Sequence, residues 1–156
     1  MKVLLQRVSR AEVRVDGAVV GKIGAGLLIL LGIEQGDQKA DVEYYTDKTA
    51  DLRIFPDSDS IMNRSLVDTG GAALVVSQFT LASDTRRGRR PSFSRAAAPR
   101  EAEHLYEYFI ERLKQRIPEV SAGLFQAMME VDLVNDGPVT IMLDPPGTHQ
   151  ARTAPR

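Results

Sequence analysis

The stretch LVNDGPVTIML, residues 133–143, decides how the end of this chain folds, because it looks like one apolar strand with four chain-breaking residues in its middle. A proline cannot donate a hydrogen bond to a neighbouring strand, and a glycine weakens a strand. The sequence Asn-Asp-Gly-Pro at 135–138 therefore favours one of two structures. The first is an ordinary hairpin loop. The second is a rigid backbone corner that presents its carbonyl groups as fixed walls, since an X-Pro bond can be cis at a cost of only about 0.5 to 1 kcal/mol.

Strands are predicted on both sides of this break, over residues 127–134 and 139–143, and further strands lie upstream. From residue 2 to residue 23, apolar and polar residues alternate around Asp16-Gly17, a dipeptide typical of a tight hairpin turn. Continuous apolar runs at 27–33 and 72–82 have the length of strands that are buried on both faces.

Two amphipathic helices are predicted between these strands. In residues 37–52, apolar side chains recur every three or four positions after Asp37, which can cap a helix. Residues 99–117 show the same spacing and are followed by Pro118, which ends the helix. The elements predict a protein of the α/β class.

Length and composition predict a single domain. The chain has 156 residues, of which 43% are hydrophobic, enough for one well-buried core and too few for two. We expect this domain over residues 1–144, with a polar loop at 56–65, and a disordered proline-rich tail over 145–156. The absence of cysteine excludes disulfides, thiolate nucleophiles and cysteine-bound metals. The first residues are too soon interrupted by charge for a signal peptide or a membrane span, so a cytoplasmic protein without a membrane partner is expected.

The segment VVSQFTLA places hydroxyl and amide groups at the end of a predicted strand, at Ser77, Gln78 and Thr80. These side chains can simply satisfy nearby backbone groups, as such residues often do in turns. A nucleophilic role for Ser77 or Thr80 would need a general base. The chain has only two histidines, His104 on the polar side of a helix and His149 in the tail. A hydroxyl–histidine–carboxylate triad and a histidine-rich metal site are therefore both disfavoured, and no metal is expected.

The segment DTRRGRRPSF crowds four arginines around a flexible glycine and places Pro91 and Phe93 after them. A charge run is usually a solvated loop. Arginines beside an aromatic surface also suit contact with the phosphates of RNA. Because the net charge of the chain is only −1, evidence for an RNA partner must come from a local cluster such as this one. The arginines of this candidate RNA-binding loop are Arg86, Arg87, Arg89 and Arg90.

Taken together, VVSQFTLA, RGRRPSF and LVNDGPVT, with LQRVSRAEVRVDG, IGAGLLILLGI, LRIF and MN in the first half, resemble the D-aminoacyl-tRNA deacylases. The resemblance spans roughly residues 1–143. It implies a single domain whose mixed, mostly antiparallel sheets form a barrel-like core with flanking helices. It also implies a homodimer without a cofactor, which hydrolyses the ester between a D-amino acid, or glycine, and the terminal adenosine at the acceptor end of tRNA.

The resemblance further implies roles for particular residues. A cis Gly137-Pro138 bond from each subunit enters the site of the other subunit and obstructs L side chains. The opposing wall that contacts the ester consists of Ser77, Gln78, Phe79 and Thr80. Residues expected to support the Gly-Pro corner are Arg7, Asn135, Val139 and Thr140. Phe125 and Met129 are expected to line an adenosine pocket, and ordinary core packing is the alternative for both. Main-chain donors and the 2′-hydroxyl of the substrate are implied to activate water, and Thr80 is a further suggested nucleophile.

The chain departs from the family pattern at several positions, which are Ile61, Ala122, Gln126, Met128 and the tail after Asp144. The adenosine side of the site is therefore expected to differ from that of relatives. Two other classes stay open from the residues themselves. A non-catalytic RNA-binding module would need the arginines and not the Gly-Pro corner, whereas an amidohydrolase of small D-amino-acid esters or peptides would depend on Thr80 and not on RNA.

Overall fold

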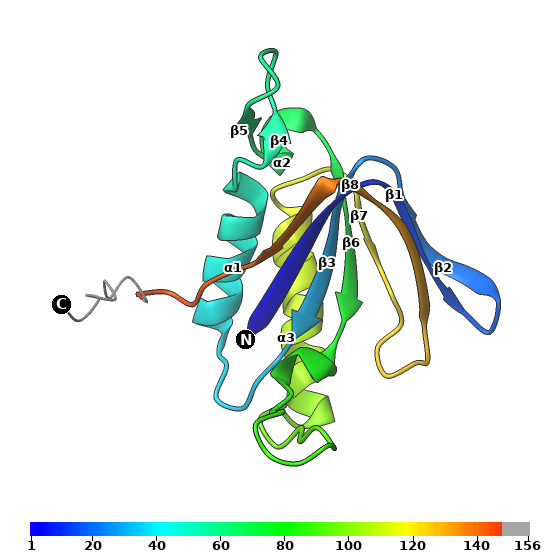
Figure 1. Ribbon diagram of the computed structural model, residues 1–156, viewed down its shortest axis with the longest axis vertical. Coiled ribbons are helices and arrows are strands. Elements are labelled where there is room, and N and C mark those ends of the chain that lie inside the picture. Colours follow the sequence, from blue (N-terminus) through cyan, green and yellow to red (C-terminus); the bar gives the residue numbers. More distant parts are fainter. Residues whose placement is uncertain (148–156) are drawn as a thin grey trace.

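The computed structural model describes residues 1–147, which form one mixed α/β domain around a strongly bent sheet (Figure 1). The predicted disordered tail over 145–156 lies mostly outside the described residues, as does His149. The strands are β1 Lys2–Val15, β2 Ala18–Ile23, β3 Gly26–Gly32, β4 Phe55–Pro56, β5 Met62–Arg64, β6 Ala72–Ser77, β7 Val120–Ala122 and β8 Glu130–Met142. The helices are α1 Lys39–Asp51, α2 Leu66–Thr69 and α3 Pro99–Lys114, with a 3₁₀ turn, η1, at Phe79–Ala82.

The long strand β1 organises the sheet because three strands pair with it. Its first half pairs with β3 and its second half with β2, while β8 follows its other edge, all antiparallel. The pairs β3–β6 and β6–β7 are parallel. The strand β2 then curls back onto β7, where the backbone nitrogen of Lys22 donates to the Ser121 hydroxyl at 3.2 Å. The sheet is therefore a nearly closed barrel, and the predicted fold class is confirmed.

Two apolar cores pack on the two faces of this sheet. The larger core lies between the sheet and the helices α1 and α3, which cover one face side by side (Figure 1). The smaller core lies inside the curl and includes Val8, Leu28 and Leu74. The inner face of α3 is formed by the buried residues Leu105, Tyr106, Phe109 and Leu113, as the apolar spacing predicts, and Ile117 is buried just beyond the end of the helix.

The start of α1 differs from the prediction. Gln38, and not Asp37, occupies the cap position, and Asp41 accepts a hydrogen bond from the backbone nitrogen of Gln38 at 2.8 Å. Asp37 instead accepts bonds from the amino group of Met1 at 2.6 Å and from the backbone nitrogen of Glu34 at 2.6 Å. The positive amino group competes for this carboxylate, and the sequence pattern cannot show that contact because it joins distant residues.

Three other boundaries also differ. The predicted polar loop at 56–65 contains a small hairpin of β4 and β5, which projects from the body of the domain (Figure 1). The predicted strand at 72–82 ends at Ser77 and turns into η1. The two predicted strands around the Gly-Pro sequence are one strand, β8, which starts at Glu130, and the short strand β7 was missed.

In the described part of the chain, no helix combines the length and the apolar character needed to cross a membrane.

Candidate active site

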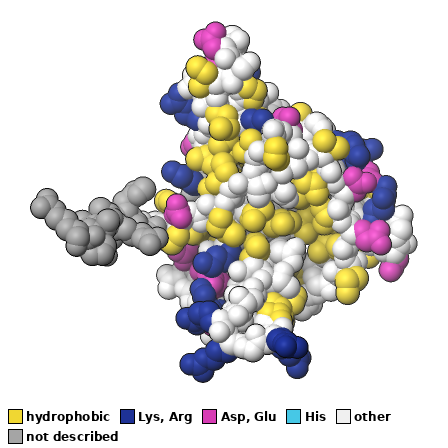
Figure 2. All heavy atoms as spheres, in the orientation of Figure 1, with side chains coloured by type: hydrophobic (Ala, Val, Ile, Leu, Met, Phe, Trp, Pro, Cys, Tyr) yellow, Lys and Arg dark blue, Asp and Glu magenta, His cyan; other side chains and the backbone are white. Residues whose placement is uncertain are grey.

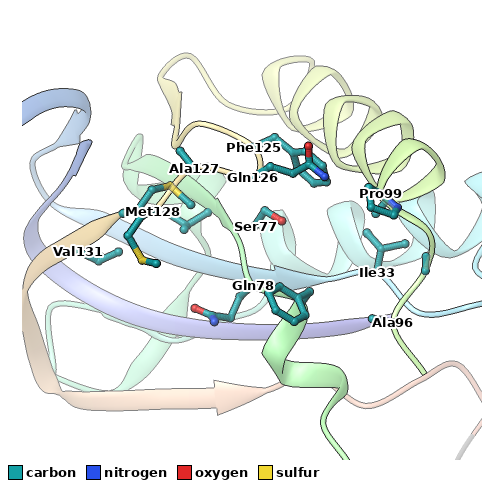
Figure 3. A pocket seen from close by; sticks show the side chains of 15 residues that line it. Ile33, Ser77, Gln78, Ala96, Pro99, Phe125, Gln126, Ala127, Met128 and Val131 are labelled. Atoms are coloured by element: carbon teal, nitrogen blue, oxygen red, sulfur yellow. The ribbon is translucent and has the colours of Figure 1, made fainter. Parts of the chain in front are cut away.

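A cavity of about 760 Å³ opens beside the carboxyl end of β6, where the strand turns into η1 (Figure 3). Ser77, Gln78 and Phe79 line it on one side, and Phe125 and Met129 line it on another. The structure thus brings together two groups of predicted site residues that are separated by almost fifty positions in the chain. The remaining wall is formed by Ile33, Val76, Ala96, Ala97, Pro99, Ala102, Gln126, Ala127, Met128 and Val131.

The turn after β6 is held tightly by its backbone. The backbone nitrogen of Gln78 donates to the carbonyl oxygen of Leu31 at 2.8 Å, and Leu81 donates to the carbonyl oxygen of Gln78 at 3.2 Å. The side-chain amide of Gln78 donates to the Thr80 hydroxyl. Thr80 is exposed beside the cavity and is not among the residues that line it. In the described part of the chain, neither the Ser77 nor the Thr80 hydroxyl has a carboxylate or imidazole partner that could act as a base.

The wall opposite Ser77 is fixed by a buried tyrosine. The Tyr106 hydroxyl donates to the Val75 carbonyl oxygen at 3.0 Å, and burial raises the pKa of Tyr106 to about 12. The Phe125 ring packs on Tyr106 with ring centres 5.6 Å apart. Phe125 is therefore both packed against the core and exposed to the cavity, so the two interpretations offered for this residue are compatible.

Sequence analysis missed the small apolar residues of this wall, above all Ala96 and Ala97. Residues 93–97 run beside the end of β3, and the backbone nitrogen of Ala97 donates to the Ile33 carbonyl oxygen at 3.0 Å. An alanine carries no chemical signal in a sequence, and only this contact between distant segments places it in the cavity.

The Gly-Pro sequence forms a bulge in β8, which we define as residues 136–139. Thr140 pairs with Gln6 and Asn135 pairs with Val8, so the four residues between them face only Arg7 and protrude from the ladder. The Gly137-Pro138 peptide bond is cis, and both residues are exposed. This Gly-Pro bulge is the rigid corner rather than a hairpin loop, because the strand continues in the same ladder after it.

Asn135 closes the mouth of the Gly-Pro bulge. Its amide nitrogen donates to the carbonyl oxygens of Arg7 and Val139 at 3.0 Å each, and its oxygen accepts from the Thr140 hydroxyl at 2.9 Å. This is the amide orientation that satisfies all three groups. The predicted supporting residues therefore contact one another around the bulge.

Arg7 supports the Gly-Pro bulge from behind. Its side chain is largely buried, its Nη1 donates to the Ile54 carbonyl oxygen at 2.7 Å, and its Nε lies 3.2 Å from Oδ2 of Asp136. A Cβ atom on Gly137 would lie 3.0 Å from Nη2 of Arg7. The guanidinium group therefore fills the space beneath the Gly-Pro bulge.

The Gly-Pro bulge and the cavity lie apart within one chain. The bulge stands level with Arg7, which pairs through Leu27 with Ala73, four residues before Ser77. Three strand spacings and four residues along a strand amount to about 20 Å. Figure 1 shows the bend of β8 at the upper end of the sheet, while η1 lies at the lower end. None of residues 136–139 is among the residues that line the cavity of the same chain.

The arginine-rich segment forms a loop below the cavity, which we call the arginine loop, residues 85–91. Asp84 and Ser92 close it with two backbone hydrogen bonds of 2.8 and 2.9 Å. Nε of Arg86 donates to Asp84 at 2.9 Å, and this arginine holds the pKa of the Asp84 carboxyl well below its usual range. The other three arginines are exposed and have no ion pair within residues 1–147. Dark blue side chains gather at this lower end in Figure 2.

Among residues 1–147, no group of three or more histidine, aspartate or glutamate side chains lies close enough together to bind a metal ion.

The family of the chain follows from comparison with known proteins. A family model described as D-Tyr-tRNA(Tyr) deacylase matches residues 4–144. The chain belongs to the D-Tyr-tRNA(Tyr) deacylase family. This confirms the resemblance inferred from the motifs, and the match to the deacylase family spans the cavity, the Gly-Pro bulge and the arginine loop.

Individual relatives of this deacylase-family chain are similar over nearly their whole length. A D-aminoacyl-tRNA deacylase of Syntrophotalea carbinolica is 58% identical over 144 residues, which cover 92% of this chain and 97% of the relative. One of Roseiflexus castenholzii is 59% identical, with 92% of each chain covered. A solved structure described as c-Myc DNA Unwinding Element Binding Protein is 39% identical, with a TM-score of 0.88 and coverage of 94% of this chain and 99% of the other.

Proposed function

We propose that this protein is a D-aminoacyl-tRNA deacylase, a hydrolase that cleaves the ester between a D-amino acid and the terminal adenosine of tRNA. Water adds to the ester carbonyl, the bond to the ribose oxygen breaks, and free tRNA and the D-amino acid are released. The observation that carries the proposal is the family match over residues 4–144, a range that includes every predicted site residue. Such an enzyme acts where aminoacyl-tRNA is found, which for this chain we take to be the cytoplasm.

The cavity suits the terminal adenosine and the ester. It is mostly apolar, as a purine ring requires, and Phe125 provides an aromatic wall for that ring. The backbone nitrogens of Phe79 and Thr80 donate to no acceptor within the described residues, as expected for the first groups of a helical turn. Because Phe79 lines the cavity, its nitrogen can stabilise the negative charge that develops on the carbonyl oxygen of the ester, and the 2′-hydroxyl of the substrate can orient the attacking water. A side-chain base is then unnecessary, which agrees with the surroundings of Ser77 and Thr80.

We further propose that the Gly-Pro bulge is the chiral filter and acts in the cavity of a second subunit. Support comes from the separation of about 20 Å within one chain, estimated from strand spacings, and from the rigid contacts of Arg7 and Asn135 with the bulge. Backbone carbonyls held at that position would admit a hydrogen, as in glycine or a D-residue, and exclude an L side chain. Exclusion discriminates more strongly than pocket contacts, which separate one methylene by only about 1 to 3 kcal/mol.

The homodimer that this filter requires would form through the open sheet face. Apolar side chains gather in the middle of the face shown in Figure 2, over the sheet and opposite the helices. Two apolar residues of β8, Val134 and Met142, are also exposed, with 43% and 45% of their surfaces accessible. An exposed apolar area of this kind is typical of a protein interface. In a two-fold dimer, each Gly-Pro bulge can reach the cavity of the partner.

The experiment that tests the proposal measures deacylation of one tRNA charged in turn with D-tyrosine, L-tyrosine and glycine. The wild-type protein should hydrolyse the D-tyrosyl and glycyl esters and spare the L-tyrosyl ester. Pro138→Ala frees the backbone of the bulge, because the ring no longer holds φ, and should hydrolyse the L-tyrosyl ester at a raised rate. Pro118→Ala, at an exposed proline beyond α3, is the matched control and should retain the wild-type selectivity.

The same assay separates the alternatives. Thr80→Ala should retain most activity, whereas complete loss would favour the nucleophilic amidohydrolase. Binding of tRNA without turnover of any of the three esters would contradict the proposal and leave a non-catalytic RNA-binding protein.

A further inference from the structure

We propose that Phe93, together with Phe79, forms a stacking subsite for the nucleobase that precedes the terminal adenosine of the substrate. The protein would then bind at least two nucleotides of the single-stranded acceptor end. This inference rests on the proposed function, because the second nucleotide is placed relative to an adenosine in the cavity.

The two phenylalanines form an exposed aromatic pair at the edge of the cavity. Their ring centres are 5.1 Å apart and their planes are inclined by 71°, an edge-to-face contact. Phe79 lines the cavity and is 56% exposed, whereas Phe93 contacts Phe79, does not line the cavity and is 36% exposed. A base that leaves the cavity therefore meets an aromatic surface before it reaches solvent.

The backbone holds Phe93 in place on both sides. Before it, Ser92 exchanges two hydrogen bonds with Asp84, of 2.8 and 2.9 Å. After it, the backbone nitrogen of Ala96 donates to the Phe93 carbonyl oxygen at 3.0 Å, and Ala96 lines the cavity. The ring is thus carried by a segment that is fixed both to the stem of the arginine loop and to the cavity wall. A platform that is ordered in advance costs little entropy when a base stacks on it.

The charges around the pair select an RNA strand rather than a protein surface. Arg87, Arg89 and Arg90 come shortly before Phe93 in the chain and have no ion pair in the described part, while the carboxylate of Asp84 is already bound by Arg86. The order of features is cavity, aromatic pair, arginines. It matches the order of groups at the end of an RNA strand, which is terminal adenosine, preceding base, preceding phosphates.

The test compares two substrates that differ only in the preceding base. One is the D-tyrosyl ester of cytidylyl-adenosine, and the other is the same dinucleotide ester with the cytosine base removed. Both contain the same phosphate, so the ratio of their kcat/KM values reports the base alone. Stacking of one base on an aromatic side chain predicts a ratio of about 10 or more for the wild-type protein.

Variants at Phe93 test whether its ring causes the difference in kcat/KM between the two esters. Phe93→Ala should lower the ratio to near one, whatever its rate on the ester without the base. Phe93→Tyr keeps an aromatic ring and should keep the ratio, which separates stacking from a general loss of structure. Val19→Ala removes an apolar side chain of similar exposure, 48%, from the hairpin of β1 and β2 and is the control.

Three results would overturn the inference. Equal ratios for the wild type and Phe93→Ala, with both esters hydrolysed, would reject the subsite and leave the proposed function standing. A change of subunit assembly in Phe93→Ala without a change of ratio would assign the aromatic pair to a protein contact instead. Hydrolysis of neither ester by the wild type would reject the proposed function and the subsite together.

Discussion

At the scale of single residues, the Gly-Pro bulge requires a glycine, which has no side chain, at position 137. Gly137 has φ +122°, a backbone conformation that L side chains rarely adopt. A Cβ atom there would lie 2.9 Å from Cγ2 of Val139 and 3.0 Å from Nη2 of Arg7. The position therefore requires glycine for two separate reasons, conformation and space.

Gly137→Ala is expected to lower the free energy of unfolding by about 1 to 3 kcal/mol, the usual cost of a strained backbone. It should also raise hydrolysis of L-tyrosyl-tRNA relative to D-tyrosyl-tRNA, because the bulge must move away from Arg7. Urea unfolding and the two deacylation rates measure these effects. Gly24→Ala is the control, since a Cβ atom there meets nothing within 4 Å. Equal effects of the two substitutions would contradict this account of the bulge.

The raised pKa of Tyr106 makes the free energy of unfolding depend on pH at high pH. Burial raises its pKa from 10.0 to about 12, so the folded state holds the phenolic proton more tightly than the unfolded state does. This contribution is fully present below pH 10 and is lost as the pH rises from 10 to 12. The free energy of unfolding should therefore fall across that window.

Tyr106→Phe should make that fall shallower, because the group that titrates is gone. At neutral pH the variant should be less stable by about 1 kcal/mol, owing to the lost hydrogen bond to Val75. Unfolding curves at pH 7, 10 and 12 measure both effects. Part of the fall should persist through Tyr45, whose pKa is also raised to about 12, chiefly by burial. An unchanged slope in Tyr106→Phe would show that this tyrosine does not contribute.

At the scale of elements, the arginine loop is a unit whose four arginines are not equivalent. Arg86 is bound to Asp84 on the stem, whereas Arg87, Arg89 and Arg90 have no partner in the described part of the chain. One of the four arginines therefore stabilises the loop, and the other three are available to bind phosphate groups.

Three contacts with single-stranded phosphates predict a slope of about −2 for the logarithm of tRNA affinity against the logarithm of salt concentration. Changing Arg87, Arg89 and Arg90 together to glutamine should bring the slope close to zero. Arg86→Gln is the matched control and should change it little, because its charge is already neutralised by Asp84. Binding titrations at four salt concentrations measure the slopes, and an equal effect of the control would contradict the division.

At the scale of the whole molecule, the arrangement of the cavity and the Gly-Pro bulge at opposite ends of the sheet predicts a site shared between subunits. Mixing two defective chains tests this. One chain carries Pro138→Ala and hydrolyses the L ester through a defective filter. The other carries Ala96→Trp, which fills the cavity and leaves its own bulge intact.

An excess of the Ala96→Trp chain should suppress L-tyrosyl-tRNA hydrolysis by the Pro138→Ala chain and leave D-tyrosyl-tRNA hydrolysis in place. The reason is that the open cavity then receives an intact bulge from the partner. An excess of a chain with both substitutions is the control and should suppress nothing. Unchanged L-ester hydrolysis in proven mixed dimers would show that each filter acts within its own chain.

The sequence by itself determined what depends on neighbouring residues. The Asp16-Gly17 hairpin, the buried strand at 27–33 and the inner face of α3 followed from turn chemistry and periodicity, and the motifs identified the family. These features are local because a turn or an amphipathic face is defined within a few residues.

Only the tertiary structure decided the features that join distant residues. The strand β8 continues through its proline because β1 supplies partners on both sides of the bulge. The alanines of the cavity wall and the use of Asp37 by the amino group of Met1 also depend on such contacts. The physical reason for these features is that hydrogen bonds and packing between distant segments override the local secondary-structure propensity wherever the two compete.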